Sequence, residues 1–205
     1  MRHLEKTEEP EVLVAHKVEW LAAYLADKAN ATAKYRYRHP DIKNSLLKEA
    51  YDKCVYCESK LGHNTPGDVE HKAPSSLHEN RHFDWDNLTI ACTECNRRKG
   101  AYDTIADAFL DPYSEGIEAR ITHYGPVVVG VPGDVGAEIC IRRLELDRGR
   151  NDLTERKVEK IIEINHLRNR IAQCDNAMLK AILEADLDRR CEVDQEFSGM
   201  VRSLI

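Results

Sequence analysis

The sequence predicts a mostly helical α+β protein, with helices before and after a small centre that has little core of its own. Apolar positions recur at helical spacing towards both ends of the chain, whereas only short stretches have the composition of strands. Between the helical parts, two C-x2-C pairs enclose a segment rich in Gly, Pro, Asn and Asp, which a metal ion would have to organise. We expect four parts: a helical arm (1–50), the centre (51–112), a mixed strand and loop segment (113–150) and a helical C-terminal part (151–205).

The composition is that of a globular protein. With 205 residues, of which 42% are hydrophobic and 32% charged, the chain can bury a core without disulfides. No apolar run approaches the roughly 18–20 residues of a membrane span, and the first residues lack the apolar stretch of a secretory signal. We therefore expect a cytoplasmic protein that does not contact membranes. The net charge of −6 does not indicate nucleic acid, but residues 34–60 hold seven basic and four acidic side chains, which allows a local basic face.

Two helices are expected in the arm. Pro10 suits the first turn of a helix, whose apolar stripe is Val14, Val18, Leu21 and Leu25. Pro40 interrupts this pattern, because the residue before a proline avoids helical backbone. A second helix is expected from Asp41 to about Asp52, from which the chain reaches Cys54 directly.

The paired cysteines are the strongest signal in the sequence: Cys54, Cys57, Cys92 and Cys95. Each C-x2-C turn can present two thiolates to one ion, and in a reducing compartment such pairs favour metal over disulfides. Four thiolates complete the coordination of Zn²⁺, so we expect a structural and not a catalytic zinc site. The 34 residues between the pairs must then form a loop or hairpin that the zinc holds at both ends.

The remainder of the chain is expected to contain strands and then a helix. ARITHYGPVVVG (119–130) and AEICIRRLEL (137–146) are both strand candidates. Asp152 and Glu155 have the spacing of a capping box ahead of a long helix. Its apolar seam alternates steps of 3 and 4 residues: Ile164, Leu167, Ile171, Cys174, Met178 and Ala181. We favour packing of this helix on its own domain, with a partner or homodimer surface as the alternative.

Polar residues follow one another in a characteristic order between the cysteines. GDVEHKAP contains Glu70 and His71, and DWDNLTIACTECNRRKG contains Asn87 and Asn96. Glu70-His71 alone reads as a surface turn, but together with the cysteine pairs residues 50–112 resemble the HNH endonuclease family. Asn96 stands at the last position of the motif, where members of the family have a histidine or, as a common variant, an asparagine. The resemblance implies a zinc-clamped ββα-metal core that hydrolyses phosphodiester bonds of nucleic acid.

The resemblance also implies a role for each of these residues. His71 is the general base, Glu70 and Asn96 hold one Mg²⁺ or other divalent cation, and Asn87 orients the loop that carries His71. A neutral imidazole suits a base near neutral pH, and oxygen ligands suit Mg²⁺. Because neighbours in a strand point to opposite faces, the strand is expected to bend or end at Glu70-His71. Phosphate contacts are expected from basic residues at the start of the following helix: Arg97, Arg98 and Lys99.

Other residues carry weaker signals. The segment KYRYR (34–38) interleaves basic and aromatic side chains, as proteins that contact phosphates and bases do, but we favour a solvated connector. The histidines at 63, 78 and 82 fit no ligand pattern.

Beyond the motif, the order of segments resembles the HNH nuclease subunit of Septu-type anti-phage systems, a PtuB-like group that also occurs with retrons. This resemblance implies an ABC/SMC-like ATPase partner (PtuA-like), with the N-terminal helices and the C-terminal seam as docking surfaces. The sequence contains no G-x4-G-K-[ST] loop, so any ATP dependence must come from that partner.

Three functions remain open from the sequence. The first is a metal-dependent endonuclease that cuts DNA as part of an anti-phage complex. The second applies the same chemistry to RNA, for example tRNA, and causes growth arrest. The third is a zinc-stabilised nucleic-acid-binding or scaffold module without catalysis. The joint presence of Glu70, His71 and Asn96 favours a nuclease, because a binding module needs the cysteines but not these residues.

Overall fold

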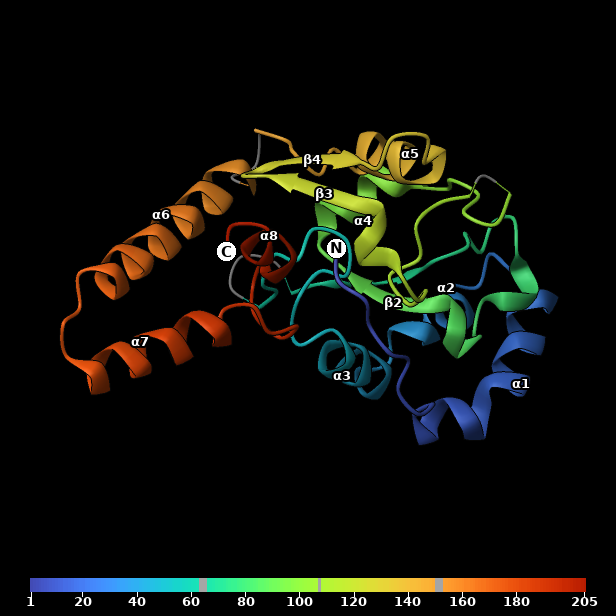
Figure 1. The fold of residues 1–205 in the computed structure, drawn as a ribbon. Coiled ribbons are helices and arrows are strands. Elements are labelled where there is room, and N and C mark those ends of the chain that lie inside the picture. The colour runs from blue at the N-terminus through green and yellow to red at the C-terminus, as the bar shows by residue number, and fades with distance from the viewer. Residues whose placement is uncertain (63–65, 107, 150–152) are drawn as a thin grey trace.

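The computed structural model describes residues 1–62, 66–106, 108–149 and 153–205. Two short antiparallel strand pairs occupy the middle of the molecule, and helical parts project from it at opposite ends (Figure 1). The prediction of a mixed α+β chain that is mostly helical is therefore confirmed. No helix within the described ranges combines the length and the apolar character needed to cross a membrane.

The N-terminal arm contains α1 (Glu11–Ala26), α2 (Ala31–Lys34), the 3-10 turn η1 (Arg36–Arg38) and α3 (Pro40–Glu49). The predicted apolar stripe of α1 is wrong, because Val14 and Val18 are 59% and 79% exposed. The helix buries another face instead, formed by Leu13, Trp20 and Tyr24. The two aromatic rings of that face pack on Phe83, and their larger area outweighs the burial of two valines.

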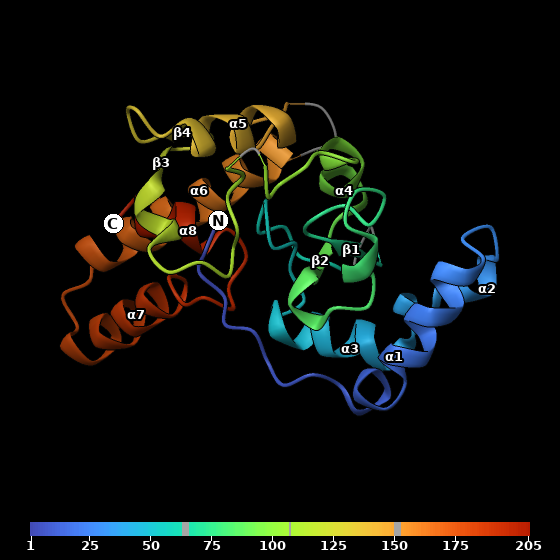
Figure 2. The same ribbon diagram turned by 90° about the vertical axis from the view of Figure 1, so that its right-hand side faces the viewer.

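The centre is a strand pair followed by a helix. β1 (Asp68–His71) runs antiparallel to β2 (Leu88–Ala91), and α4 (Thr93–Lys99) follows directly. Figure 2 shows α4 on one side of this pair and α3 on the other, and both helices contact the strands. Every residue of β2 is buried between them, as expected for a strand covered on both faces. Two 3-10 turns, η2 (Glu79–Arg81) and η3 (Trp85–Asn87), lie in the connection between the strands.

A second strand pair and a helix follow. After η4 (Ile117–Arg120), β3 (Ile121–Tyr124) and β4 (Val127–Gly130) form a hairpin from the first strand candidate. The second candidate is wrong: most of AEICIRRLEL belongs to α5 (Val135–Leu144). Asp134 caps this helix by accepting a hydrogen bond from the Ala137 amide at 2.9 Å. Ala137, Cys140, Ile141 and Leu144 are buried at helical spacing, which a short apolar run does not distinguish from a strand.

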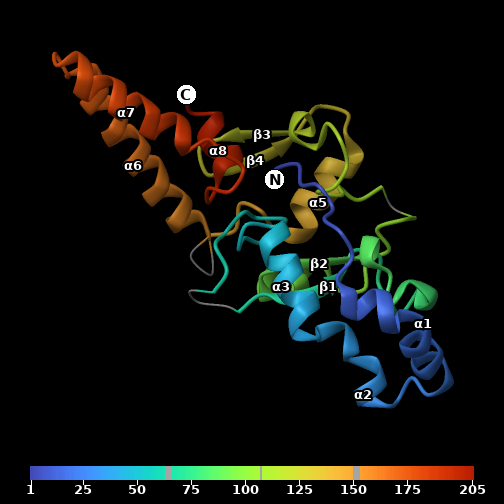
Figure 3. The same ribbon diagram turned by 90° about the horizontal axis from the view of Figure 1, so that it is seen from below.

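The C-terminal part is a helical hairpin and a short final helix. α6 (Leu153–Ala172) and α7 (Ala177–Arg189) pack side by side and extend away from the body, and α8 (Ser198–Arg202) returns to it (Figure 3). The predicted continuous seam is therefore wrong. Asn176 ends it by capping α7, so that Ile164 and Leu167 are buried while Met178 is 77% exposed. Asp152, in the predicted capping box, lies outside the described residues, and the four-part division of the chain stays a prediction.

The first residues connect the two ends of the molecule. Arg2 donates to Glu118 at 2.6 Å and to the Cys191 carbonyl at 2.9 Å, beside α8. Lys6 donates to Glu49 of α3 at 3.0 Å and to the Leu88 carbonyl at 2.8 Å. The N-terminal segment thus holds the C-terminal part and the centre together.

Candidate active site and metal centre

The four paired cysteines meet in one buried cluster. Cys54 and Cys57 lie in the turn after α3, Cys92 is the residue before α4, and Cys95 lies in its first turn. Their sulfur atoms all lie within 4.8 Å of one another, and those of Cys57 and Cys92 are 3.9 Å apart. A zinc ion with Zn–S bonds of about 2.3 Å in a tetrahedron places its sulfurs about 3.8 Å apart. The cluster therefore fits a structural zinc ion.

Arg148 lies beside this cluster, which the sequence did not indicate. Its guanidinium nitrogens lie 3.8 and 3.9 Å from the Cys95 sulfur. Burial opposes the charge of Arg148, but the neighbouring cysteines raise its pKa above the ordinary value. A zinc ion with four thiolates carries a net negative charge, and this buried cation offsets it.

Glu70 is held from two sides inside the centre. One carboxylate oxygen accepts a hydrogen bond from the hydroxyl of Tyr56, which stands in the first cysteine turn. The other lies 3.4 Å from the Lys99 ammonium and has no hydrogen-bond partner. Burial raises the pKa of Glu70, while Lys99 and Tyr56 act in the opposite direction. The first cysteine turn and α4 thus fix the orientation of this carboxylate.

His71 is the last residue of β1, and its ring is oriented by the chain on either side of it. Nε2 lies 2.8 Å from the His82 carbonyl oxygen. A carbonyl can only accept, so Nε2 carries the proton and Nδ1 is the acceptor of the neutral ring. Burial lowers the pKa of His71 to about 3, which keeps the ring neutral at neutral pH. The His71 carbonyl accepts from Lys99 at 2.8 Å.

Asn87 is fully buried and bonds the loop that follows His71. Its Oδ1 accepts from the Ala73 amide at 2.8 Å, and its Nδ2 donates to the Ala73 carbonyl at 3.0 Å. Nδ2 also lies 3.1 Å from the Arg81 carbonyl oxygen. These are the contacts of a residue that positions the loop, and none of them reaches the hollow in which the other predicted residues meet.

One hollow of about 220 Å³ brings the remaining site residues together. Glu70, His71, Asn96 and Lys99 all line it. Glu70 and His71 both line it although both pair regularly with β2; the strand ends at His71, as expected, and Pro74 of the following turn also lines the hollow. Asn96 donates to the Asp68 carboxylate at 3.2 Å, and Asp68 lies two residues before Glu70 on the same strand face. Glu70 and Asn96 therefore line the same hollow as the imidazole, and Asp68 bonds Asn96 without lining the hollow itself.

The three basic residues after the last cysteine lie elsewhere than predicted. α4 begins at Thr93, so Arg97, Arg98 and Lys99 occupy its last turn and not its N-terminus. Arg97 pairs with Glu94 at 2.7 Å, and Arg98 pairs with both Glu94 and Glu145. Lys99 is only 2% exposed and is occupied by Glu70 and the His71 carbonyl. These three residues therefore lie at the negative and not the positive end of the helix dipole.

The arm supplies a wall of the site that sequence reasoning missed. The ring of Tyr37 meets that of His71 edge to face at 4.6 Å, and His82 stacks between His71 at 4.7 Å and Tyr24 at 4.0 Å. His82 Nε2 is 2.8 Å from the Lys34 carbonyl oxygen. The interleaved aromatic residues of KYRYR were the available signal, and the favoured interpretation as a solvated connector does not fit the burial of Tyr37.

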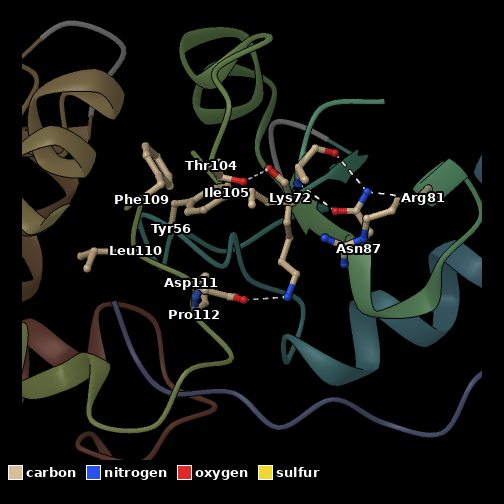
Figure 4. Close-up of a pocket in the computed structure, with 11 residues that line it drawn as sticks. Tyr56, Lys72, Arg81, Asn87, Thr104, Ile105, Phe109, Leu110, Asp111 and Pro112 are labelled. Atoms are coloured by element: carbon tan, nitrogen blue, oxygen red, sulfur yellow. Dashed lines mark hydrogen bonds and ion pairs between the residues drawn. The ribbon is translucent and has the colours of Figure 1, made fainter. Parts of the chain in front are cut away.

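A second, smaller hollow of about 120 Å³ lies behind the loop (Figure 4). Lys72 crosses it to Asp111 at 2.8 Å, and the Thr104 hydroxyl donates to the Lys72 carbonyl at 2.8 Å. Asn87 lines this hollow, whereas His71 lines the other. The loop after β1 thus lies between two hollows: one is lined by Asn87, which holds the loop, and the other by the candidate catalytic residues.

Comparison with known proteins gives two matches. Residues 54–101 match the HNH endonuclease family model, and this range contains all four cysteines and each predicted site residue. Over 113 residues the chain is 30% identical to a Septu protein PtuB of Bacillus thuringiensis, a match that covers 55% of this chain and 42% of the relative. The chain thus spans about two fifths of the length of that relative. Residues 54–101 thus match the HNH endonuclease family, and a Septu protein PtuB is a distant homologue of the chain.

Proposed function

We propose that this chain is a metal-dependent endonuclease that hydrolyses phosphodiester bonds of DNA. The observation that carries the proposal is the shared hollow of Glu70, His71 and Asn96, with Glu70 bonded by Tyr56 of the first cysteine turn. A structural zinc module needs the cysteines, but it has no use for an oriented neutral imidazole beside buried carboxylate and amide oxygens.

In the proposed reaction, Nδ1 of His71 takes the proton from the attacking water. The His82 carbonyl fixes the tautomer that this step requires, and Lys99 holds the backbone of the base. Asn87 keeps the following loop in place, so that the imidazole stays in line with the phosphate.

The residues present fit a divalent cation as the second component. Glu70 has a buried oxygen without a hydrogen-bond partner, 3.4 Å from the Lys99 ammonium, and Asn96 lines the same hollow while its amide donates to Asp68. We assign Glu70 and Asn96 as ligands, and Mg²⁺ suits such a site because it takes few protein ligands and keeps several waters. When bound, the ion would neutralise charge on the phosphate and the leaving oxygen.

The test is nicking of supercoiled plasmid by the purified chain, with and without added MgCl₂. His71→Ala is expected to lower the rate about 100-fold or more, since a general base contributes at least that much. His78→Ala is the matched control, because His78 lies on the same loop but pairs with Asp103 outside the hollow. Zinc content must be equal in all three proteins. Undiminished nicking by His71→Ala would refute the mechanism.

The resemblance to the Septu protein also supports a role in anti-phage defence with an ABC/SMC-like ATPase partner. We assign docking to the helical ends, where apolar side chains are exposed on α7 (Met178, Ile182) and on α1 (Val14, Val18). Co-purification of this chain with an ATPase encoded by an adjacent gene tests this role. Met178→Glu with Ile182→Glu should abolish co-purification if α7 docks, and Val14→Glu with Val18→Glu should do so if α1 docks. Retention of the partner by both double variants would contradict the assignment.

A further inference from the structure

The arm carries two unpaired cations at the edge of the candidate catalytic hollow. Lys34 and Arg38 are exposed, and Arg38 lines the hollow together with His71 and Asn96. Within the part of the chain that the structure describes, no carboxylate lies within 4.0 Å of either cation. Their positive charge is therefore available to a ligand.

The cations of α4 are not available in this way. Arg97 and Arg98 both pair with Glu94, and Lys99 is buried against Glu70. An anion that enters the hollow thus meets an uncompensated guanidinium on the arm side and neutralised ion pairs on the α4 side.

An aromatic ring stands next to these cations. Tyr35 is 43% exposed, and the Arg38 guanidinium lies 4.5 Å from the centre of its ring. The neighbouring Tyr37 is buried and packs on the His71 ring at 4.6 Å, so the position of residues 34–38 is fixed relative to His71. A cation beside an exposed ring is how proteins hold the phosphate and the base of one strand.

We propose that Lys34, Tyr35 and Arg38 form a strand-binding subsite. Arg38 binds the phosphate adjacent to the one in the hollow, Lys34 binds a phosphate further along the strand, and Tyr35 stacks on an unpaired base between them. The subsite rests on the proposed function, since its ligand is the nucleic acid that the hollow would cleave. In this proposal the N-terminal arm, and not α4, supplies the phosphate contacts next to the general base His71.

The test is the fluorescence anisotropy of labelled single-stranded and duplex oligonucleotides, of DNA and of RNA, bound to the full chain without added divalent cation. Arg38→Gln and Lys34→Gln should each lower the slope of log affinity against log salt, by about 0.7 for a single strand and about 0.9 for a duplex. Tyr35→Ala should weaken binding of the single strand about fivefold or more, and binding of the duplex less. Arg97→Gln is the matched control and should leave the slope unchanged, because Glu94 already neutralises that cation.

The outcomes separate the subsite from the cleavage mechanism. Equal affinities and salt slopes for wild type and the three arm variants would overturn the subsite even if His71→Ala abolishes cleavage. A lower slope of log affinity against log salt in Arg97→Gln alone would place the phosphate contacts on α4 and would also overturn the subsite. No binding of any oligonucleotide by the wild-type chain would overturn both proposals. Reduced slopes in the arm variants, with cleavage retained by His71→Ala, would support the subsite and refute the mechanism.

Discussion

We expect replacement of Asn87 by alanine to displace the loop that follows His71, and so to slow cleavage, without loss of zinc. The side chain makes two buried hydrogen bonds to Ala73 and a partly buried one to the Arg81 carbonyl, at 2.8, 3.0 and 3.1 Å. At about 1 kcal/mol for each bond lost, Asn87→Ala should lower the free energy of unfolding by about 3 kcal/mol. A water molecule that enters from the hollow of Figure 4 would reduce this to about 2 kcal/mol, since Asn87 lines that hollow.

The expected loss of activity is larger than the loss of stability suggests. Domains of this size have about 5–15 kcal/mol of stability, so the variant stays folded at 25 °C. Ala73 is two residues from the base, and a displacement of the loop by about 1 Å can slow catalysis about 100-fold. Zinc content should not change, because Asn87 makes no bond to the cysteine turns.

The assay combines urea unfolding, metal analysis and plasmid nicking for Asn87→Ala, Asn87→Asp and a control. Asn87→Asp keeps an acceptor for the Ala73 amide but sets a carboxylate against two carbonyls, so it should be at least as harmful. Asn176→Ala is the control: it removes the cap of α7 and should cost about 1 kcal/mol without any effect on cleavage. Loss of zinc from Asn87→Ala would refute the assigned role, and full cleavage in a destabilised variant would show that the loop position does not matter.

Three further predictions concern other parts of the chain. Cys57→Ser should lose zinc and cooperative unfolding, whereas Cys174→Ser, outside the cluster, should lose neither; a folded Cys57→Ser protein without zinc would contradict the structural role. Burial lowers the pKa of His123 to about 3 in the folded protein, whereas it is about 6.5 in the unfolded chain. The unfolded chain therefore takes up the proton at higher pH than the folded protein, and the free energy of unfolding falls as the pH drops below about 6.5. Urea unfolding at pH 7 and at pH 5 measures how much the free energy of unfolding falls between the two. This fall should be smaller by about 1–2 kcal/mol in His123→Asn than in wild type, and equal falls would refute the prediction. Tyr56→Phe should raise the Mg²⁺ concentration needed for cleavage, because Glu70 loses its hydrogen bond; an unchanged Mg²⁺ dependence with zinc retained would refute the positioning of Glu70 by Tyr56.

The parts of the structure that could be predicted from the sequence are those that depend on local rules. Two C-x2-C pairs have the spacing of a four-thiolate metal site, so the meeting of the four cysteines follows from that spacing. The starts of α1 and α3 follow from Pro10 and Pro40, and the β3–β4 hairpin follows from a β-branched run interrupted by Gly-Pro.

The errors arise where tertiary packing decides between local alternatives. Two apolar faces of α1 have helical spacing, and contact with Phe83 selects the one that contains Trp20 and Tyr24. The seam of the C-terminal part is continuous in the sequence, but Asn176 offers a helix start within it, and the chain folds back into a hairpin. Neither choice can be read from the periodicity alone, because both alternatives satisfy it.

The same reasoning explains why the arm was missed as part of the candidate active site. No family motif extends to residues 24–38, since their contribution is aromatic rings and one backbone carbonyl, which leave no fixed spacing in a sequence. Tyr24 supports His82, the Lys34 carbonyl anchors the His82 ring, and the His82 carbonyl in turn orients His71. Tyr37 of the arm packs on the His71 ring directly, and His82 packs on its other neighbour Tyr24. The arm is therefore part of what orients the candidate base, although it lies outside the motif.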